Sequence, residues 1–468
     1  MISSEQQNFD FDGVITSANG HEFPASCRLT LPDATWQRTE IHISVAQIAG
    51  RQSLPNPLNL SGNDRYGRQV TIRDIHYHSI HFEFNRQTGL AEMEIKHVGE
   101  VEVIHAIPIS QASRVINISL SDAQYLKSKK GKLVDSKDYT RIEELFSLDL
   151  PELGHGTFLR QWRFWHNVDN VTSKGACSFL LELKDLPKGF NIDSAAEQIR
   201  SALSIPSVFL RQRLAVNGWE EQGATIREIV RQPFAPILPK NFAMQPYEYL
   251  VQESQLENVM QRACVNFSKL APKLKRTVEK IALGLSPYNH LGDEERFRAM
   301  FYGLESCRKL TSKVPSAEVL KARDEVLVAL KFAHKELSGA AAERVNGFIN
   351  SVENGPKVDL RIEIEEVLDN WKVARSDLWP LYGSEAEPGL VKIRDKLSHS
   401  GGTSVNNDSL VLATYHLSLL MERIILAILD IPLSETLLSP EALKIDPWYA
   451  RDRVLSARRA AFTKSVWS

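Results

Sequence analysis

Residues 233–246 read PFAPILPKNFAMQP, with prolines at the first, fourth, seventh and last of these positions. Proline fixes its own φ and has no backbone N–H, so such a stretch holds neither a helix nor a central strand. We expect an extended linker over residues 231–247 that separates two differently built parts of the chain.

The part before the linker, residues 1–230, alternates apolar and polar residues in the manner of strands. Clear examples are IHISV at 41–45, VEVI at 101–104 and VINISL at 115–120. Short strands with frequent turns predict a β-rich, sandwich-like domain. Within it we expect one helix over 192–203 and a polar surface loop over 127–137.

The part after the linker has the apolar spacing of helices. We expect helices near residues 248–283, 293–313, 316–337, 340–353, 358–374, 386–399 and 408–430. The last is apolar over most of its surface, so it should lie at the centre of a bundle or in a subunit interface. The predicted fold class is therefore α+β multidomain: the β-rich domain, the linker, an all-α bundle (248–435) and a basic C-terminal tail (436–468).

Composition and charge are those of a soluble globular protein of two or three domains. The 468 residues are 43% hydrophobic and 24% charged, with a formal net charge of -2 and a pI near 6.7. This charge disfavours broad coating of nucleic acid but allows an enzyme that grips a few phosphates. The N-terminus lacks the features of a signal peptide, and charges interrupt the apolar run 410–431. We therefore expect a cytoplasmic protein without a membrane span.

Several other residue patterns favour structural interpretations. Four cysteines (Cys27, Cys177, Cys264 and Cys307) are scattered without CxxC spacing, which predicts reduced thiols and no structural zinc. In HYHSIH at 76–81 only two histidines share a strand face, too few for a metal site. WRFWH at 162–166 fits a sheet core, although such residues also stack on single-stranded bases. The motifs of ATP hydrolysis, serine hydrolysis and zinc proteolysis are absent, and no cofactor is expected.

The stretch most informative about chemistry is KIRDKLSHSGG at 392–402. Arg394 is a permanent cation that can hold a phosphate, and His399 titrates near neutral pH and can move a proton. Asp395 lies four residues before His399, so on a helix it can hold one imidazole nitrogen. Such groups can cut RNA without a metal, because the 2′-hydroxyl supplies the nucleophile. The competing interpretation is an ordinary helix, since an Arg and a His at this spacing often occur by chance.

A second motif lies on an earlier predicted helix, where Glu305 is followed three residues later by an Arg308-Lys309 pair. With the two motifs in this order, residues 249–435 resemble the HEPN superfamily. Its ribonucleases carry Arg, four to six residues, then His, and a Glu, three residues, then Lys or Arg on an earlier helix. In layout the chain is similar to the ApeA-like HEPN proteins of bacterial anti-phage defence, which join a β-rich N-terminal region to a C-terminal HEPN bundle.

The resemblance implies a metal-independent endoribonuclease that leaves 2′,3′-cyclic phosphate and 5′-hydroxyl ends on RNA, with tRNA as a candidate substrate. It implies a homodimer that brings two copies of the Arg-His motif together, with Glu305, Lys309 and Lys396 lining the cleft. It also implies a role in abortive infection, in which the β-rich region senses a phage-derived trigger.

Two questions stay open at the level of sequence. Arg394 and His399 are five residues apart, which is about 140° around an ideal helix. They converge only if the helix loosens before His399 or if they meet across a dimer. The alternative function is a non-catalytic HEPN scaffold or a nucleotide-binding module, with a β domain that binds a protein or ligand.

Overall fold

The structure, a computed structural model, describes a series of separate segments of the chain. These are residues 8–16, 22–31, 40–46, 56–81, 90–106, 115–120, 130–135, 140–166, 173–184, 186, 189–222, 225–231, 249–285, 292–310, 317–354, 360–399 and 405–462. Internal contacts divide the chain into two units: Met1–Ser268 with Tyr288–His290, and Lys269–Pro287 with Leu291–Ser468.

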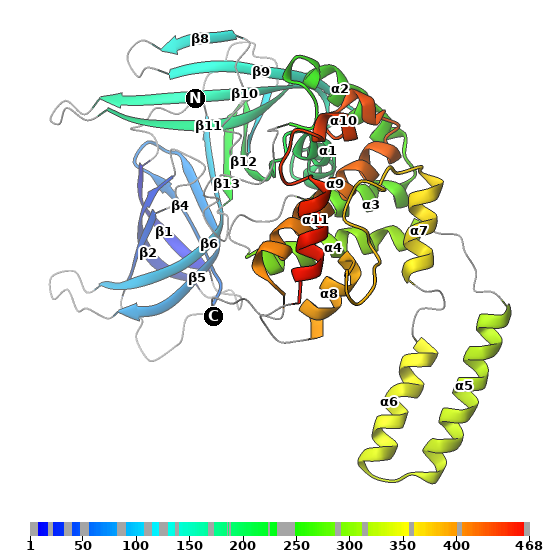
Figure 1. The fold of residues 1–468 in the computed structure, drawn as a ribbon. Helices are drawn as coiled ribbons and strands as arrows, with labels where there is room; N and C mark the ends of the chain where they lie inside the picture. Colours follow the sequence, from blue (N-terminus) through cyan, green and yellow to red (C-terminus); the bar gives the residue numbers. More distant parts are fainter. Residues whose placement is uncertain are drawn as a thin grey trace. The chain divides into compact units, whose positions relative to one another are not determined.

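The described residues confirm the expected α+β architecture, with strands dominating the first unit and helices the second (Figure 1). Apart from Arg231, the expected linker (231–247) lies outside the described residues. The division between the two units follows Ser268, so residues 249–268, which the sequence analysis assigned to the bundle, cluster with the β-rich unit.

The described strands of the first unit form one antiparallel hydrogen-bonded network. Six strands come first: β1 (Asn8–Thr16), β2 (Glu22–Thr30), β3 (Glu40–Ala46), β4 (Leu58–Asp64), β5 (Gln69–His81) and β6 (Leu90–Ala106). The others are β7 (Val115–Leu120), β8 (Lys130–Asp135), β9 (Thr140–Leu150), β10 (Gly154–His166), β11 (Ser173–Lys184), β12 (Val216–Gln222) and β13 (Thr225–Arg231).

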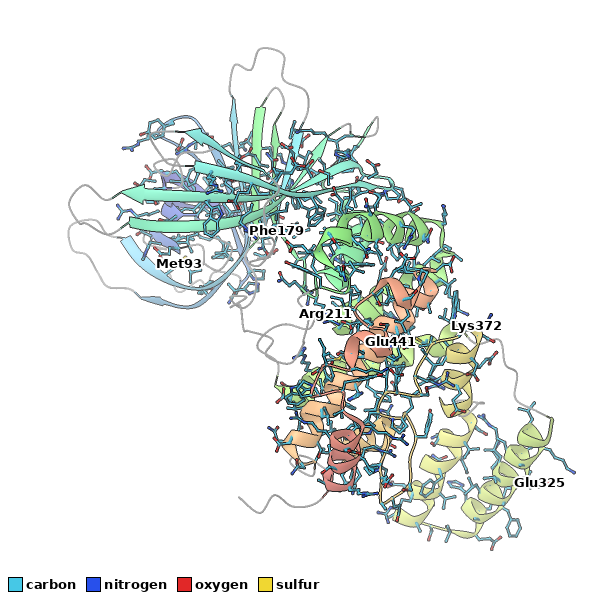
Figure 2. All side chains as sticks on the ribbon, turned by 45° about the horizontal axis from the view of Figure 1, so that its top comes forward. Met93, Phe179, Arg211, Glu325, Lys372 and Glu441 are labelled. Carbon is cyan, nitrogen blue, oxygen red and sulfur yellow. The ribbon has the colours of Figure 1, made fainter. Side chains whose placement is uncertain are left out.

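Strands β1 to β6 close on themselves, where the sequence analysis expected a sandwich-like arrangement. Their order is β3-β2-β1-β4-β5-β6, and β6 also pairs with β3, with Ile43 opposite Met93 (labelled in Figure 2). Because side chains alternate along a strand, one face of each strand supplies the enclosed core, which includes Phe9 and Ile72. The 17-residue length of β6 lets it pair with β3 near its start and with β13 near its end.

The remaining strands continue from β6 in the order β13-β12-β7-β11-β10-β9-β8. The expected surface loop at 127–137 is partly wrong, because Lys130–Asp135 form strand β8, which pairs with β9 and ends the row of described strands. Edge strands commonly carry lysine, which masks the alternation expected of a strand. The helix expected at 192–203 is found as α1 (Ala196–Phe209).

Side chains of helix α2 (Leu256–Lys269) accept hydrogen bonds from backbone N–H groups of β9, in the part of β9 that follows its pairing with β8. Glu257 accepts a hydrogen bond from the backbone N–H of Ser147 at 3.0 Å, and Gln261 accepts one from that of Asp149 at 2.7 Å. These two side chains lie one helical turn apart, which matches donors two residues apart on a strand. A sheet edge left unpaired would be open to aggregation, so these contacts explain why α2 belongs with the strands.

The second unit contains most of the helices. They are α3 (Pro272–Leu285), α4 (Asp293–Glu305), η3 (Ser306–Leu310), α5 (Ala317–Glu336), α6 (Ala340–Asn354), α7 (Leu360–Asn370), α8 (Leu390–His399), α9 (Asn407–Ile428), η4 (Leu433–Glu435), α10 (Pro440–Leu443) and α11 (Arg451–Ala460). The single helix expected over 248–283 is two, α2 and α3. Pro272 is the first residue of α3, a position where a helix tolerates its missing N–H.

The C-terminal segment is part of the helical unit, so the expected basic tail (436–468) is wrong for its described residues. Helix α11 packs against α9. The backbone N–H of Asn406 donates to the carbonyl of Ala461 at 2.8 Å, and Ser409 Oγ donates to that of Ala457 at 2.8 Å. The many arginines of α11 made the sequence of this segment look like a solvent-exposed tail. The helix nevertheless has a small buried face, which includes Val454.

Helix α9 forms the core of the second unit. Nearly all of its residues are buried, and α3, α4, α8 and α11 pack against it. The side chain of Asn406 caps its first turn by accepting a hydrogen bond from the backbone N–H of Ser409 at 3.2 Å. By length and composition α9 could cross a membrane, but 94% of its most apolar window is buried inside the protein.

His416 is a fully buried polar residue of α9. Its Nδ1 accepts a hydrogen bond from the backbone N–H of Trp379 at 3.3 Å, so Nε2 carries the proton and donates to the carbonyl of Trp448 at 3.2 Å. Burial lowers the pKa of His416 from 6.5 to about 4. A proton added at Nδ1 would also face the N–H of Trp379, which disfavours the charged form.

We predict that the helical unit loses stability as the pH falls from 6.5 towards 4. The folded pKa of His416 lies below the unfolded one, so the unfolded chain binds the proton first. The stabilisation is complete above pH 6.5, and about 3 kcal/mol is lost on reaching pH 4, at 1.36 kcal/mol for each pKa unit. Urea titrations followed by far-UV circular dichroism across this range measure it. His416→Gln should flatten the profile, and an equally steep profile in that variant would contradict the assignment.

Candidate functional site

The two sequence motifs meet in the structure although they lie far apart in the chain. Glu305 is the last residue of α4, and Arg394 lies in the middle of α8. The guanidinium of Arg394 forms an ion pair with Glu305 through Nη2 and another with Asp395 through Nη1, the latter at 2.9 Å. These side chains are partly exposed, at 31% for Arg394, 22% for Glu305 and 44% for Asp395, so the cluster is accessible to solvent.

Two further residues of α4 hold α8 in place. The guanidinium of Arg394 lies 5.7 Å from the ring centre of the buried Phe301, a cation–π distance. Arg298 Nη2 donates to the backbone carbonyl of Leu397 at 2.6 Å. That carbonyl belongs to the last turn of α8, where backbone acceptors lack helical partners and favour a cation. Arg298, Phe301 and Glu305 therefore form one face of α4 directed at α8.

The carboxylates dominate the electrostatics of this cluster. Burial alone would lower the pKa of Arg394, but its hydrogen bond to Asp395 and the charge of Glu305 outweigh burial and raise the pKa above its ordinary value. One guanidinium faces two carboxylates, so the three groups together carry a net negative charge. An incoming phosphate would have to displace at least one carboxylate to reach Arg394.

The positions of the other predicted site residues differ from the prediction or are not described. Asp395 contacts Arg394, where the sequence analysis expected it to hold the imidazole of His399. His399 is the last residue of α8, and its side chain, like that of Lys309, lies outside the described part of the structure. Lys396 Nζ lies 5.9 Å from the ring centre of Phe462.

The backbone of α8 answers one of the questions left open by the sequence. Residues Leu390–His399 are one continuous helix, so the helix does not loosen between Arg394 and His399. The Cα atoms of the two residues are consequently about 140° apart around the helix axis.

Arg298 and Phe301 were not identified from the sequence as parts of the site. The signal was present, because Arg298, Phe301 and Glu305 are spaced i, i+3, i+7, which places them on one helix face. The sequence did not single out this face, because Phe297 and Met300 on the same helix are equally suited to an inward-facing side. Both are buried next to it.

The other patterns contribute no site among the described residues. HYHSIH lies within β5, and no group of three metal-binding side chains occurs in the described part of the chain. Trp162 lies in β10, and its Nε1 donates to Glu143 at 3.3 Å. The side chains of 163–166 and Cys177 lie outside the described residues. Cys27, Cys264 and Cys307 are buried free thiols, and burial raises the pKa of each to about 12, so they are poor nucleophiles.

Comparisons of the chain with protein-family models, with curated proteins and with solved structures found no match. The function is therefore inferred from the site itself.

We predict that the Arg394 cluster contributes little to folding. Exposed ion pairs are typically worth about 1 kcal/mol or less, so Glu305→Gln and Arg394→Ala should each lower the free energy of unfolding by about that amount. Arg308→Ala, which breaks a comparable ion pair with Glu363, is the matched control. Urea denaturation measures all three. A loss of more than about 3 kcal/mol on removing Arg394 would instead indicate a structural ion pair.

Proposed function

We propose that this protein is a metal-independent endoribonuclease whose active site includes Arg394 and His399. The observation that supports it is the convergence of α4 and α8, which joins Glu305 of one motif to Arg394 of the other. The two motifs are 89 residues apart in the chain, so this convergence is a property of the fold. It fits the HEPN resemblance, in which both motifs belong to one cleft.

The proposed chemistry uses the 2′-hydroxyl of RNA as the nucleophile. Arg394 holds the scissile phosphate and stabilises the charge that develops during in-line attack. His399 accepts the proton of the 2′-hydroxyl or donates one to the departing 5′-oxygen. The products are a 2′,3′-cyclic phosphate and a 5′-hydroxyl, and no metal or other cofactor takes part.

The proposed active site is shared between two chains. Regular helix geometry separates Arg394 from His399 by about 140°, so a two-fold axis beside α8 is needed to bring Arg394 of one chain to His399 of the other. A second copy would also place a second Arg394 and a second His399 at the same cleft. Glu305 and Asp395 then hold Arg394 in position until a phosphate replaces one of them.

The proposed biological role follows the resemblance. An RNase held inactive until infection, acting on tRNA or another cellular RNA, would halt translation in a cytoplasm invaded by phage. The β-rich unit would detect the phage-derived trigger.

One observation favours a second candidate, a non-catalytic scaffold. Arg394 has two carboxylate partners and a buried aromatic neighbour, as a structural arginine does. Under this alternative the α4–α8 contact only stabilises the bundle, and the β-rich unit binds a protein or ligand.

We predict that the wild-type protein cleaves tRNA or a labelled single-stranded RNA in excess EDTA, and that Arg394→Ala and His399→Ala each abolish cleavage. A mixture of the two variants, unfolded and refolded together, should recover about one quarter of the activity: half of the dimers are mixed, and each mixed dimer keeps one intact site. Gel electrophoresis with end-group analysis of the products measures this.

The outcomes separate the alternatives. Cleavage that survives both substitutions would refute the site, and activity that is lost in both variants but never restored by mixing would refute the shared site. Arg200→Ala removes an exposed arginine of α1 that is paired with Glu197 and belongs to neither motif, and this variant should cleave like the wild type. If the wild type is inactive on both RNAs, expression of wild type and variants in phage-infected cells tests for a required trigger. Equal survival of all these cultures would favour the scaffold.

A further inference from the structure

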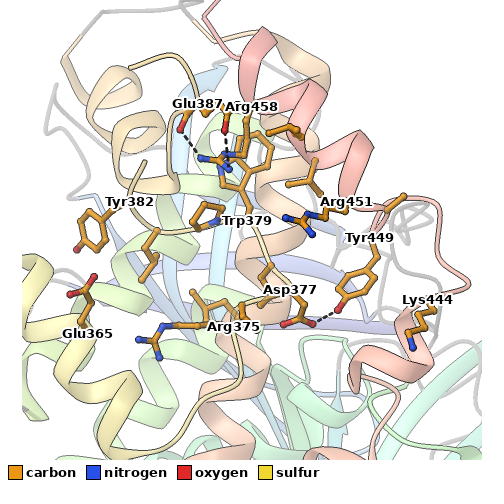
Figure 3. Close-up of a pocket in the computed structure, with 18 residues that line it drawn as sticks. Glu365, Arg375, Asp377, Trp379, Tyr382, Glu387, Lys444, Tyr449, Arg451 and Arg458 are labelled. Carbon is orange, nitrogen blue, oxygen red and sulfur yellow. Dashed lines mark hydrogen bonds and ion pairs between the residues drawn. The ribbon is translucent and has the colours of Figure 1, made fainter. Parts of the chain in front are cut away.

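The helical unit also contains a cavity of about 1030 Å³ to which Glu305, Arg394 and Asp395 do not contribute (Figure 3). It is bordered by the loop 375–382, by residues 444–458 around the start of α11, and by single residues of α7 and α9. Its volume is at the upper end of the range of small-molecule sites, and it is too confined for a folded partner. The proposed RNA cleavage does not use it.

The inner wall of this cavity is apolar and aromatic. Trp379 is almost fully buried, and its indole N–H donates to the carbonyl of Pro388 at 3.0 Å, which fixes the ring. Leu381 and Leu420 continue the wall. Figure 3 shows Tyr382 and Glu365 at one end of the cavity, and Lys444 and Arg451 towards the other. The wall suits the body of an organic molecule, with a different polarity at each end.

Most charged residues around the cavity are already neutralised. Asp377 is paired with Arg423 at 2.7 Å. Glu387 is paired with Arg459 at 2.8 Å and, more loosely, with Arg458 at 3.8 Å. These acidic side chains therefore present little net negative charge to a ligand.

Arg375 is likewise neutralised, by Asp369 at 2.7 Å. Lys444 and Arg451 differ from it, because neither has an ion-pair or hydrogen-bond partner among the described residues. Both are exposed and both line the cavity. Two unmatched cations at the end of an apolar cavity produce a positive potential there, which favours an anionic group over a neutral one.

We propose that this cavity binds a small organic anion. Lys444 and Arg451 hold its phosphate or carboxylate group, and its aromatic or aliphatic body lies against Pro380, Tyr382 and Leu455, which line the cavity and are partly exposed. Each charge-assisted hydrogen bond is stronger than a neutral one, and burial of the apolar body supplies the remaining affinity. The site is distinct from the Arg394 cluster, and the proposal stands whether or not the protein cleaves RNA.

The test is isothermal titration calorimetry of the full-length protein with 1-naphthyl phosphate and with 1-naphthoate, which share the body and differ in the anionic group. We expect one molecule of at least one of these probes to bind per chain. The double variant Lys444→Ala/Arg451→Ala should weaken that binding at least about tenfold, or 1.4 kcal/mol. Arg453→Ala is the matched control, because Arg453 is on the same helix but stacks on Trp448 at 4.1 Å and does not line the cavity.

Neutral 1-naphthol and inorganic phosphate complete the set of probes. Both should bind more weakly than the aromatic anion, because 1-naphthol lacks the anionic group and inorganic phosphate lacks the apolar body. Three results would overturn the proposal: no heat with either anion at millimolar concentration, equal affinity in the double variant, or 1-naphthol binding as tightly as the anions. Because Lys444 and Arg451 are exposed, the double variant should fold normally, which circular dichroism verifies.

Discussion

The buried guanidinium of Arg423 is the interaction on which the helical unit depends. Its side chain is 1% exposed and lies on the central helix α9. It makes a two-pronged ion pair with Asp377 at 2.7 Å for each bond, and it donates to the carbonyls of Ala374 at 2.9 Å and Leu438 at 2.8 Å. A buried charge is tolerated only when it is paired and fully hydrogen-bonded. Arg423 can therefore stay inside only while two loops remain attached to α9.

The constraint extends from Arg423 to the Arg394 cluster through the backbone. Asp377, fixed by Arg423, begins the segment that continues to Trp379 and Leu381. The backbone N–H groups of Leu390 and Val391 then donate to the carbonyls of Pro380 and Leu381, each at 3.0 Å. Leu390 and Val391 form the first turn of α8, one turn before Arg394. The loop that lines the cavity thus also sets the position of the helix that carries the proposed catalytic arginine.

Sequence patterns predicted the elements better than their contacts. Helices such as α5 and α9 were placed within a few residues, because periodicity and capping are local properties of the chain. The closure of β3 on β6 depends on pairing between residues about 50 apart, which alternation does not encode. Strand β8 was missed because lysines interrupt its alternation, and helix α11 was missed because its arginines outnumber the residues that it buries.

The same limit applies to the candidate site. Arg394 was identified from its residue type and its spacing to His399, and Glu305 from the resemblance to the HEPN superfamily, but their ion pair depends on how α4 crosses α8. Asp395 was expected beside the imidazole of His399 because both lie on one helix face, yet its carboxylate contacts the adjacent Arg394. The cavity was not foreseen, since Trp379, Lys444 and Arg451 come from separate segments and match no motif.

The loop between the cavity and α8 has two positions where only glycine fits. A methyl group on Gly383 would overlap the carbonyl oxygen of Glu387, and one on Gly389 would overlap that of Leu381. Both obstacles are backbone atoms, which cannot rotate aside as a side chain can. Residues 384–386 between them are exposed. Substitutions should therefore be tolerated at residues 384–386 and not at the two glycines. Related chains can vary in the exposed part of the loop while both glycines stay unchanged.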